Sequence, residues 1–148
     1  MANPLNKEKI KLAVQGSRSL CDARVKILLL EEIKKYDVGE IITSGEPGGV
    51  CNVARKLCEE MAIPLKLYFL NFRYLNGAFE HRSINIINDA DRIIFIHDGI
   101  SKGTKNEIKL AQKAKVLYTY HKLEKATNQE DCNELEKSMD LDLTNYEI

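Results

Sequence analysis

The sequence predicts an α/β domain built on a doubly wound parallel sheet of about five strands, with helices on both faces. Five apolar segments of strand length recur between residues 10 and 120, and 92–97 (RIIFIH) is the clearest of them. The segments between them place apolar residues three and four positions apart, which is typical of amphipathic helices. Several strand segments end in glycine-containing turns that lead into the next helix. Strands that alternate with such helices form βαβ units, in which the strands lie parallel and the helices cover them.

The predicted elements alternate through the first 121 residues. Apolar runs predict strands at 10–15, 40–44, 65–70, 92–97 and 115–120. Helical spacing predicts helices at 22–36, 50–61, 79–89 and 104–114. The third helix has Phe79, Ile84, Ile86 and Ile87 as candidates for its buried side. We therefore predict one domain over residues 1–121 and an acidic C-terminal tail over 122–148, helical or disordered.

Length and composition favour an ordinary globular domain. The chain has 148 residues, of which 44% are hydrophobic and 30% charged. No apolar stretch approaches the roughly 20 residues of a membrane helix, and the N-terminus lacks the basic-then-apolar order of a signal peptide. We therefore expect a cytoplasmic protein. Its four cysteines form no CxxC or Cys/His cluster, so we expect no metal site, and no cofactor is required by any pattern.

The charge is distributed unevenly along the chain. Formal net charge is zero, but residues 122–148 carry three basic and eight acidic side chains, which leaves an excess of five positive charges for residues 1–121. That excess suits a small anionic ligand. It is too weak and too scattered for a dedicated nucleic-acid surface.

Three turns carry the polar side chains that could bind a ligand. In a parallel sheet the carboxyl ends of the strands meet at one edge, where ligands bind near the point at which strand order reverses. We therefore expect the turns at 16–19, 45–49 and 98–103 to converge on one site.

The first turn combines small residues with a cation. Gly16, Ser17 and Ser19 allow a tight turn whose free amides and hydroxyls attract an anion. Arg18 would add a two-pronged donor for phosphate or carboxylate. The alternative is a simple helix cap made by Ser19, with Arg18 in solvent.

The second turn has three glycines in five residues, Gly45, Gly48 and Gly49, which is more than a strand-to-helix turn needs. A ligand could therefore approach its backbone closely. Glu46, if it points inward, would repel a phosphate and would suit a ribose hydroxyl or a base edge. The alternative is a tight loop that binds nothing.

The last turn carries the candidate catalytic residues. Thr104 and Glu107, three residues apart at a helix start, fit a capping box that needs no ligand. In the functional interpretation the Thr104 hydroxyl binds phosphate and Glu107 lies near a sugar. Asp98 on the same edge could act as a general base. Gly99, Ser101 and Gly103 complete the predicted ligand-binding set of this turn.

Taken in order, these turns resemble those of the SLOG superfamily, a Rossmann-like group that includes the LOG phosphoribohydrolases and the DNA-processing protein DprA. The resemblance is greatest to its small YspA/YpsA-type members and spans about residues 10–121. The matching positions are Gly16-Ser17-Arg18, residues 44–54, Arg73-Tyr74, Gly77, Arg82-Ser83, Asp98-Gly99, Ser101, Gly103 and Thr104.

The resemblance implies binding of a nucleotide or nucleotide derivative by a sensor or a small enzyme, with Arg82 reaching toward the ligand from the third helix. Three positions depart from the family pattern. Glu46 and Cys51 stand where it usually has Gly and Asp, and Ser83 replaces the common Asn. The LOG hydrolases use a PGGxGTxxE motif, of which only Gly103-Thr104-x-x-Glu107 is present.

Three hypotheses follow. The first is a nucleotide-binding sensor or small nucleotide-processing protein. The second is an N-glycosidic phosphoribohydrolase or transferase in which Glu107 or Asp98 stabilises the cationic sugar. The third is a protein-interaction adaptor that uses the acidic tail. We also expect a homodimer, because small doubly wound domains often bury a helix face against a copy.

Overall fold

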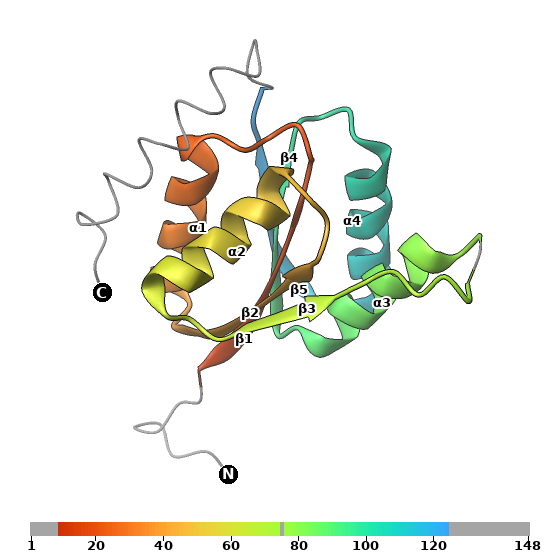
Figure 1. Ribbon diagram of the computed structural model, residues 1–148, viewed down its shortest axis with the longest axis horizontal. Helices are drawn as coiled ribbons and strands as arrows, with labels where there is room; N and C mark the ends of the chain where they lie inside the picture. Colours follow the sequence, from red (N-terminus) through yellow and green to blue (C-terminus); the bar gives the residue numbers. More distant parts are fainter. Residues whose placement is uncertain (1–8, 75, 125–148) are drawn as a thin grey trace.

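The predicted sheet is present, with all five strands parallel. The computed structural model describes residues 9–74 and 76–124. Its strands are β1 (Ile10–Gly16), β2 (Val38–Ser44), β3 (Leu65–Tyr68), β4 (Arg92–His97) and β5 (Leu117–Lys122), arranged in the order β3-β2-β1-β4-β5. This confirms a Rossmann-like α/β fold (Figure 1).

Four helices cover the sheet, two on each face. They are α1 (Ala23–Lys35), α2 (Gly49–Met61), α3 (Ala78–Asp89) and α4 (Lys102–Ala114). Helices α1 and α2 lie on one face, and α3 and α4 lie on the other (Figure 1). The sheet is therefore doubly wound, as predicted.

Alternation along the two central strands builds a core on each face. Side chains of successive strand residues point to opposite faces of a sheet. In β1, Leu12 and Val14 enter the core beneath α1 and α2, whereas Ala13 enters the core beneath α3 and α4. In β4, Ile94 enters the core beneath α1 and α2, and Phe95 enters the core beneath α3 and α4. Both faces of these strands are buried, which is why their sequences are continuously apolar.

Some boundaries and burial assignments differ from the prediction. Strand β3 ends at Tyr68 rather than at residue 70, and α4 begins at Lys102, two residues before its predicted start. Ile86 and Ile87 are buried as proposed, but Phe79 and Ile84 are exposed. Within the described ranges, no helix is long and apolar enough to cross a membrane.

The predicted tail falls almost entirely outside the described residues. Strand β5 runs through Lys122, and the Leu123 amide donates to the His97 carbonyl at 2.9 Å. The first residues assigned to the tail therefore still belong to the edge of the sheet. The adaptor hypothesis depends on residues beyond 124 and stays a prediction.

Strand order reverses beside β1. The chain runs outward from β1 through β2 to β3 and then returns to β4 on the other side of β1. At such a switch point the helices after the two strands diverge to opposite faces and leave a crevice at the carboxyl edge. Gly16 ends β1 at this edge, and Asp98 follows β4 there.

Two glycines allow the turns at this edge to pack closely. Gly49 has a φ of 69°, and a Cβ on it would overlap the backbone of Arg18. A Cβ on Gly16 would overlap the Ile96 carbonyl oxygen and the side chain of Val50. The Val50 amide also donates to the Ser17 carbonyl at 3.3 Å. The start of α2 therefore lies directly against the turn that follows β1.

We predict opposite effects for two glycine-to-alanine substitutions. Gly49→Ala should lower the free energy of unfolding by at least about 2 kcal/mol, because it adds a clash to an unfavourable φ. Gly103→Ala, in the first turn of α4 with no atom within 4 Å of the new Cβ, should raise it by up to about 1 kcal/mol. Urea denaturation of both variants measures the difference. Equal stability of the two variants would contradict this account of the turn.

Candidate functional site

A cavity of about 430 Å³ lies at the carboxyl edge of the sheet, beside the switch point. The turns after β1 and β2, helix α3, the segment after β4 and the start of α4 all contribute to its walls. Its lining residues are Gly16, Arg18, Ser19, Glu46, Phe79, Glu80, Arg82, Ser83, Asp98, Ile100, Ser101, Gly103, Thr104, Asn106 and Glu107.

One wall carries a carboxylate held between two arginines. Glu46 accepts from Arg18 Nε at 3.2 Å and from Arg82 Nη2 at 2.5 Å. Burial alone would raise the pKa of Glu46, but the hydrogen bonds from Arg18 and Arg82 hold this pKa below its ordinary value. Arg82 is buried and stands 5.4 Å from the centre of the Phe79 ring, whereas the Arg18 side chain is 62% exposed. Arg18 is thus the cation that a ligand can reach from solvent.

A second wall is organised by Asp98. Its Oδ1 accepts from the amides of Ile100 and Ser101, both at 2.8 Å, and its Oδ2 accepts from the Ser19 hydroxyl at 2.7 Å. The Asp98 amide donates to Ser17 Oγ at 3.0 Å. Burial would raise the pKa of Asp98, but these hydrogen bonds lower it to about 2. Asp98 is therefore an ionised group that fixes the β4–α4 segment against the turn after β1.

The structure excludes the suggestion that Ser19 caps α1. The N-cap of α1 is Asp22, whose side chain accepts from the Arg24 amide at 2.9 Å. The Ser19 hydroxyl instead faces Asp98 in the cavity. The Ser19 side chain is therefore part of the site and not part of the helix start.

The capping box suggested for the start of α4 is also absent. Helix α4 begins at Lys102 with Ser101 as N-cap, and no side chain in the described part of the chain caps it. Thr104 lies within the first turn and is 1% exposed, and its Oγ1 has no hydrogen-bond partner among the described residues. The buried Glu107 Oε2 also lacks one. Two buried polar atoms beside uncapped backbone amides therefore belong to the wall of the cavity.

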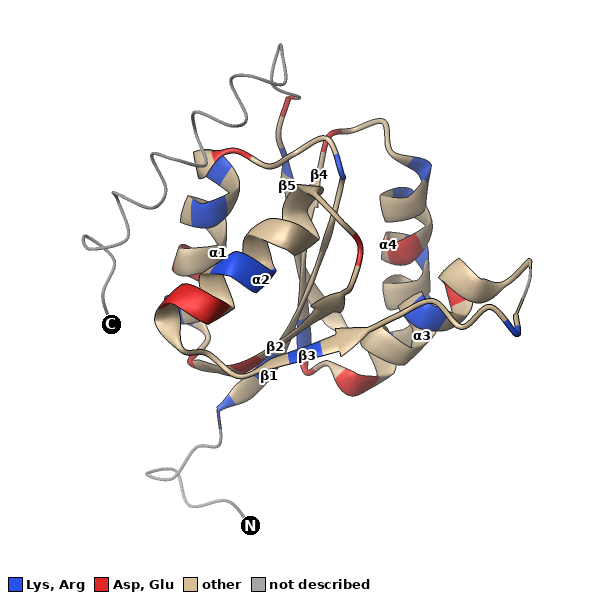
Figure 2. Ribbon diagram, viewed as in Figure 1, with Lys and Arg blue, Asp and Glu red and all other residues tan. Residues whose placement is uncertain are grey.

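Glu107 is a carboxylic acid held in its neutral form. Burial is the main cause that raises its pKa to about 8, and the negative charge of Glu46 adds to it, while Arg82 opposes it. Glu46 lies in the turn after β2 and Glu107 on α4, and Figure 2 shows acidic positions in both segments. At pH 7 most Glu107 side chains therefore carry a proton that can be donated.

The structure brings ten of the predicted site residues to this cavity: Gly16, Arg18, Ser19, Glu46, Arg82, Asp98, Ser101, Gly103, Thr104 and Glu107. The other five do not line it. Ser17 is buried and accepts from the Asp98 amide, and Gly49 packs against Arg18. Gly45 abuts the Phe69 ring, Gly48 is the N-cap of α2, and Gly99 faces a different cavity.

Sequence reasoning did not assign ligand contact to Phe79, Glu80, Ser83, Ile100 or Asn106, which also line the cavity. The sequence spacing could have identified two of these residues, Phe79 and Ser83. Phe79 and Ser83 lie three positions before and one after Arg82, so all three share one face of α3. The apolar spacing suggested that Phe79 was core, although its ring is 58% exposed.

The raised pKa of Glu107 predicts a pH dependence of stability. Folding binds a proton wherever the folded pKa exceeds the unfolded one, so this group's contribution falls as pH rises from about 4.5 to about 8. Glu107→Gln cannot titrate. Its melting temperature minus that of the unsubstituted protein should therefore increase between pH 5 and pH 8. Glu59→Gln, at an exposed position of α2, is the control, and it should give the same difference at both pH values. A pH-independent difference for Glu107→Gln would refute the assignment.

Comparison with known proteins gives no match. No protein-family model, curated protein or solved structure matches the chain. Among the described residues, no group of three or more His, Cys, Asp and Glu is placed to hold a metal ion.

Proposed function

We propose that the chain binds a nucleotide or a nucleotide-derived ligand in this cavity, as a ligand sensor or a small nucleotide-processing protein. One observation carries the proposal. The start of α4 contains Thr104 and Glu107, which line the cavity together with Arg18 and Arg82, and their buried Thr104 Oγ1 and Glu107 Oε2 have no hydrogen-bond partner among the described residues. Buried polar atoms without partners are costly, so their presence in the wall of the cavity supports a ligand that satisfies them.

The start of α4 is suited to the phosphate. The first amides of a helix have no partner within the helix and carry a partial positive charge, so they bind anions. Thr104 Oγ1 is an additional donor on this turn, and the Arg18 guanidinium is a charged donor that solvent can reach. These groups together favour one phosphate rather than a long polyphosphate, because Glu46 and Asp98 are negatively charged nearby.

The remaining walls suit a sugar and a base. Glu46 and Glu107 present carboxyl oxygens that can hydrogen-bond to ribose hydroxyls. The exposed ring of Phe79 offers an apolar surface on which a base can stack. The volume of about 430 Å³ lies within the usual range for small-molecule sites. This ligand class is also the one implied by the resemblance to the SLOG superfamily.

Thr104→Val tests the proposal, because it removes the unpartnered hydroxyl and keeps the shape of the side chain. The substitution should raise the stability of the ligand-free protein by about 1 kcal/mol. It should also reduce the ligand-induced shift in melting temperature. The screen comprises nucleoside monophosphates, NAD, ADP-ribose and cyclic dinucleotides, and a ligand at 100 times its Kd should stabilise the unsubstituted protein by about 2.7 kcal/mol.

Thr43→Val is the matched control. Thr43 is fully buried in β2 and donates its hydroxyl to the Val14 carbonyl at 2.7 Å. Its substitution should destabilise the protein and leave the ligand-induced shift unchanged. Absence of any shift in the folded, unsubstituted protein, or an unchanged shift in Thr104→Val, would refute binding at this turn.

A second candidate function is hydrolysis of an N-glycosidic bond, which the two carboxyl groups of the cavity favour. Their environments push the pKa values apart, to about 8 for Glu107 and about 2 for Asp98. Such a division supplies one acid and one carboxylate at neutral pH. Glu107 would donate its proton to the departing base as the bond to C1′ breaks. Asp98 would stabilise the cationic sugar, water would add at C1′, and the proton released by that water would return to Glu107.

Glu107→Gln distinguishes the enzyme from the sensor. If the chain is a hydrolase, release of free base from the ligand found in the screen should fall by at least about 100-fold, because the proton donor is lost. The ligand-induced thermal shift should remain. Chromatography of the reaction mixture measures the base. A bound ligand that stays intact with the unsubstituted protein would overturn the hydrolase and leave the sensor.

A further inference from the structure

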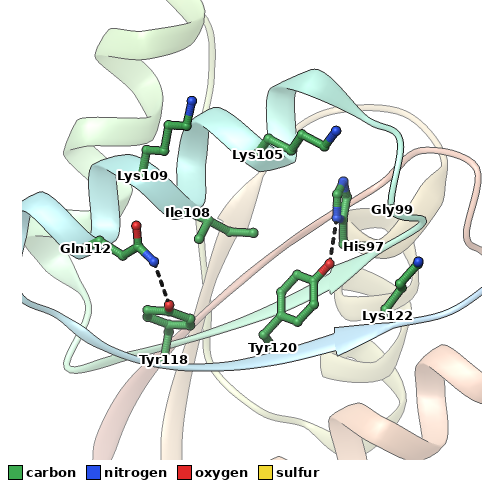
Figure 3. Close-up of a pocket in the computed structure, with 9 residues that line it drawn as sticks. All are labelled: His97, Gly99, Lys105, Ile108, Lys109, Gln112, Tyr118, Tyr120 and Lys122. Atoms are coloured by element: carbon green, nitrogen blue, oxygen red, sulfur yellow. Dashed lines mark hydrogen bonds between the residues drawn. The ribbon is translucent and has the colours of Figure 1, made fainter.

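A second cavity, of about 540 Å³, lies between α4 and β5 (Figure 3). We infer that it binds a small anion that carries a planar ring, independently of the function proposed above. Its lining residues are His97, Gly99, Lys105, Ile108, Lys109, Gln112, Tyr118, Tyr120 and Lys122. None of these residues lines the first cavity.

The charge of this cavity is entirely positive. Lys105 and Lys109 come from α4 and Lys122 from the end of β5, and no acidic side chain is among the lining residues. Within residues 9–74 and 76–124, none of these three lysines forms an ion pair. Lys105 and Lys109 are four positions apart on one helix, a spacing at which like charges repel. An anion between the lysines would relieve this repulsion.

The tyrosines supply both a flat apolar surface and a hydrogen-bond donor. Figure 3 shows Tyr118 pointing from β5 toward Gln112 of α4, and Tyr120 pointing from β5 toward His97. Gln112 Nε2 donates to the Tyr118 hydroxyl oxygen at 3.0 Å, so the hydroxyl proton of Tyr118 remains to be donated. The Tyr118 ring is held by an edge contact with Phe95, with the ring centres 5.6 Å apart. An aromatic anion could therefore pack against the Tyr118 ring and accept a hydrogen bond from the Tyr118 hydroxyl.

The opposite end of the cavity is fixed by His97. This side chain is 2% exposed, and its Nε2 lies 3.0 Å from the Ser101 carbonyl oxygen, which can only accept. In a neutral ring Nε2 therefore carries the hydrogen, and Nδ1 accepts from the Tyr120 hydroxyl at 2.9 Å. Tyr120 is thereby held in one orientation, and its hydroxyl proton is used within the protein.

The size of the cavity indicates a ligand larger than an inorganic anion. A volume of about 540 Å³ lies within the range of small-molecule sites, and the cavity walls include two tyrosine rings and Ile108. A bare phosphate would contact the lysines and leave these apolar surfaces exposed to water. A planar ring attached to the anion would cover them.

Phenyl phosphate is the probe for this inference, with inorganic phosphate and phenol as its separate halves. In a ¹H–¹⁵N NMR titration of the full-length protein, we expect saturable shifts at Lys105, Lys109, Gln112 and Tyr118. Phenyl phosphate should bind about tenfold or more tightly than either half, because both the charge and the ring are recognised. Equal binding of inorganic phosphate would overturn the planar-ring requirement.

Variants separate this cavity from the candidate site. Lys109→Ala and Tyr118→Phe should each weaken phenyl phosphate binding about fivefold or more. Lys113→Ala removes a lysine of the same helix that does not line the cavity, and it should have no effect. Arg82→Ala, which alters the first cavity, should leave this binding unchanged. Shifts confined to Arg18, Ser19 and Thr104, or equal loss in Lys113→Ala, would overturn the inference whether or not the proposed function holds.

Discussion

Everything at the candidate site depends on how closely three backbone turns approach one another at the carboxyl edge of the sheet. Gly16 and Gly49 permit this approach, because a Cβ on Gly49 would overlap the backbone of Arg18, and a Cβ on Gly16 would overlap the Ile96 carbonyl oxygen of β4 and the Val50 side chain at the start of α2. The contact places the start of α2 against Ser17 and Arg18, and Ser17 in turn accepts from the Asp98 amide. Three segments far apart in the sequence are thereby joined before any ligand is present.

Some polar groups of the cavity have hydrogen-bond partners within the protein, and others have none among the described residues. Which groups belong to each set indicates their role. Asp98 uses its oxygens to hold the segment after β4, and Glu46 is held between two arginines. Thr104 Oγ1 and Glu107 Oε2 have nothing comparable within the described chain. A protein selected for stability alone would cap the helix or fill this corner with apolar groups, so such local conflicts mark functional sites.

The sequence was sufficient for the architecture and for the edge at which the turns meet. Apolar runs such as 92–97 identify buried strands, and parallel topology brings their carboxyl ends together whatever the details of packing. It was less informative about individual side chains. Helix α4 begins two residues earlier than predicted, so Thr104 lies in its first turn and not at the cap position. The predicted capping interaction is therefore absent. Element boundaries are specified less well by local patterns than the presence and type of the element.

The site residues on α3 show a second limit. Phe79 has the spacing of a core residue, yet it is exposed at the cavity, whereas Ile86 and Ile87 further along the helix belong to the core. Periodicity gives the face of a helix but not the point along its axis at which the core ends. The sequence also does not distinguish the roles of the glycines. Gly49 allows close packing against Arg18, whereas Gly103 lines the cavity, and only the three-dimensional structure shows this difference.

The segment from His97 to Ser101 is a wall shared by the two cavities. Gly99 faces the lysine-lined cavity, whereas Asp98, Ile100 and Ser101 face the other, and His97 joins Tyr120 on one side to the Ser101 carbonyl on the other. A molecule that displaces this wall from either side changes what the opposite side presents. Thermodynamic linkage makes such coupling reciprocal: each occupant would alter the affinity for the other by the same factor. The two proposed ligands would therefore lie on opposite sides of a single loop, residues 97–101.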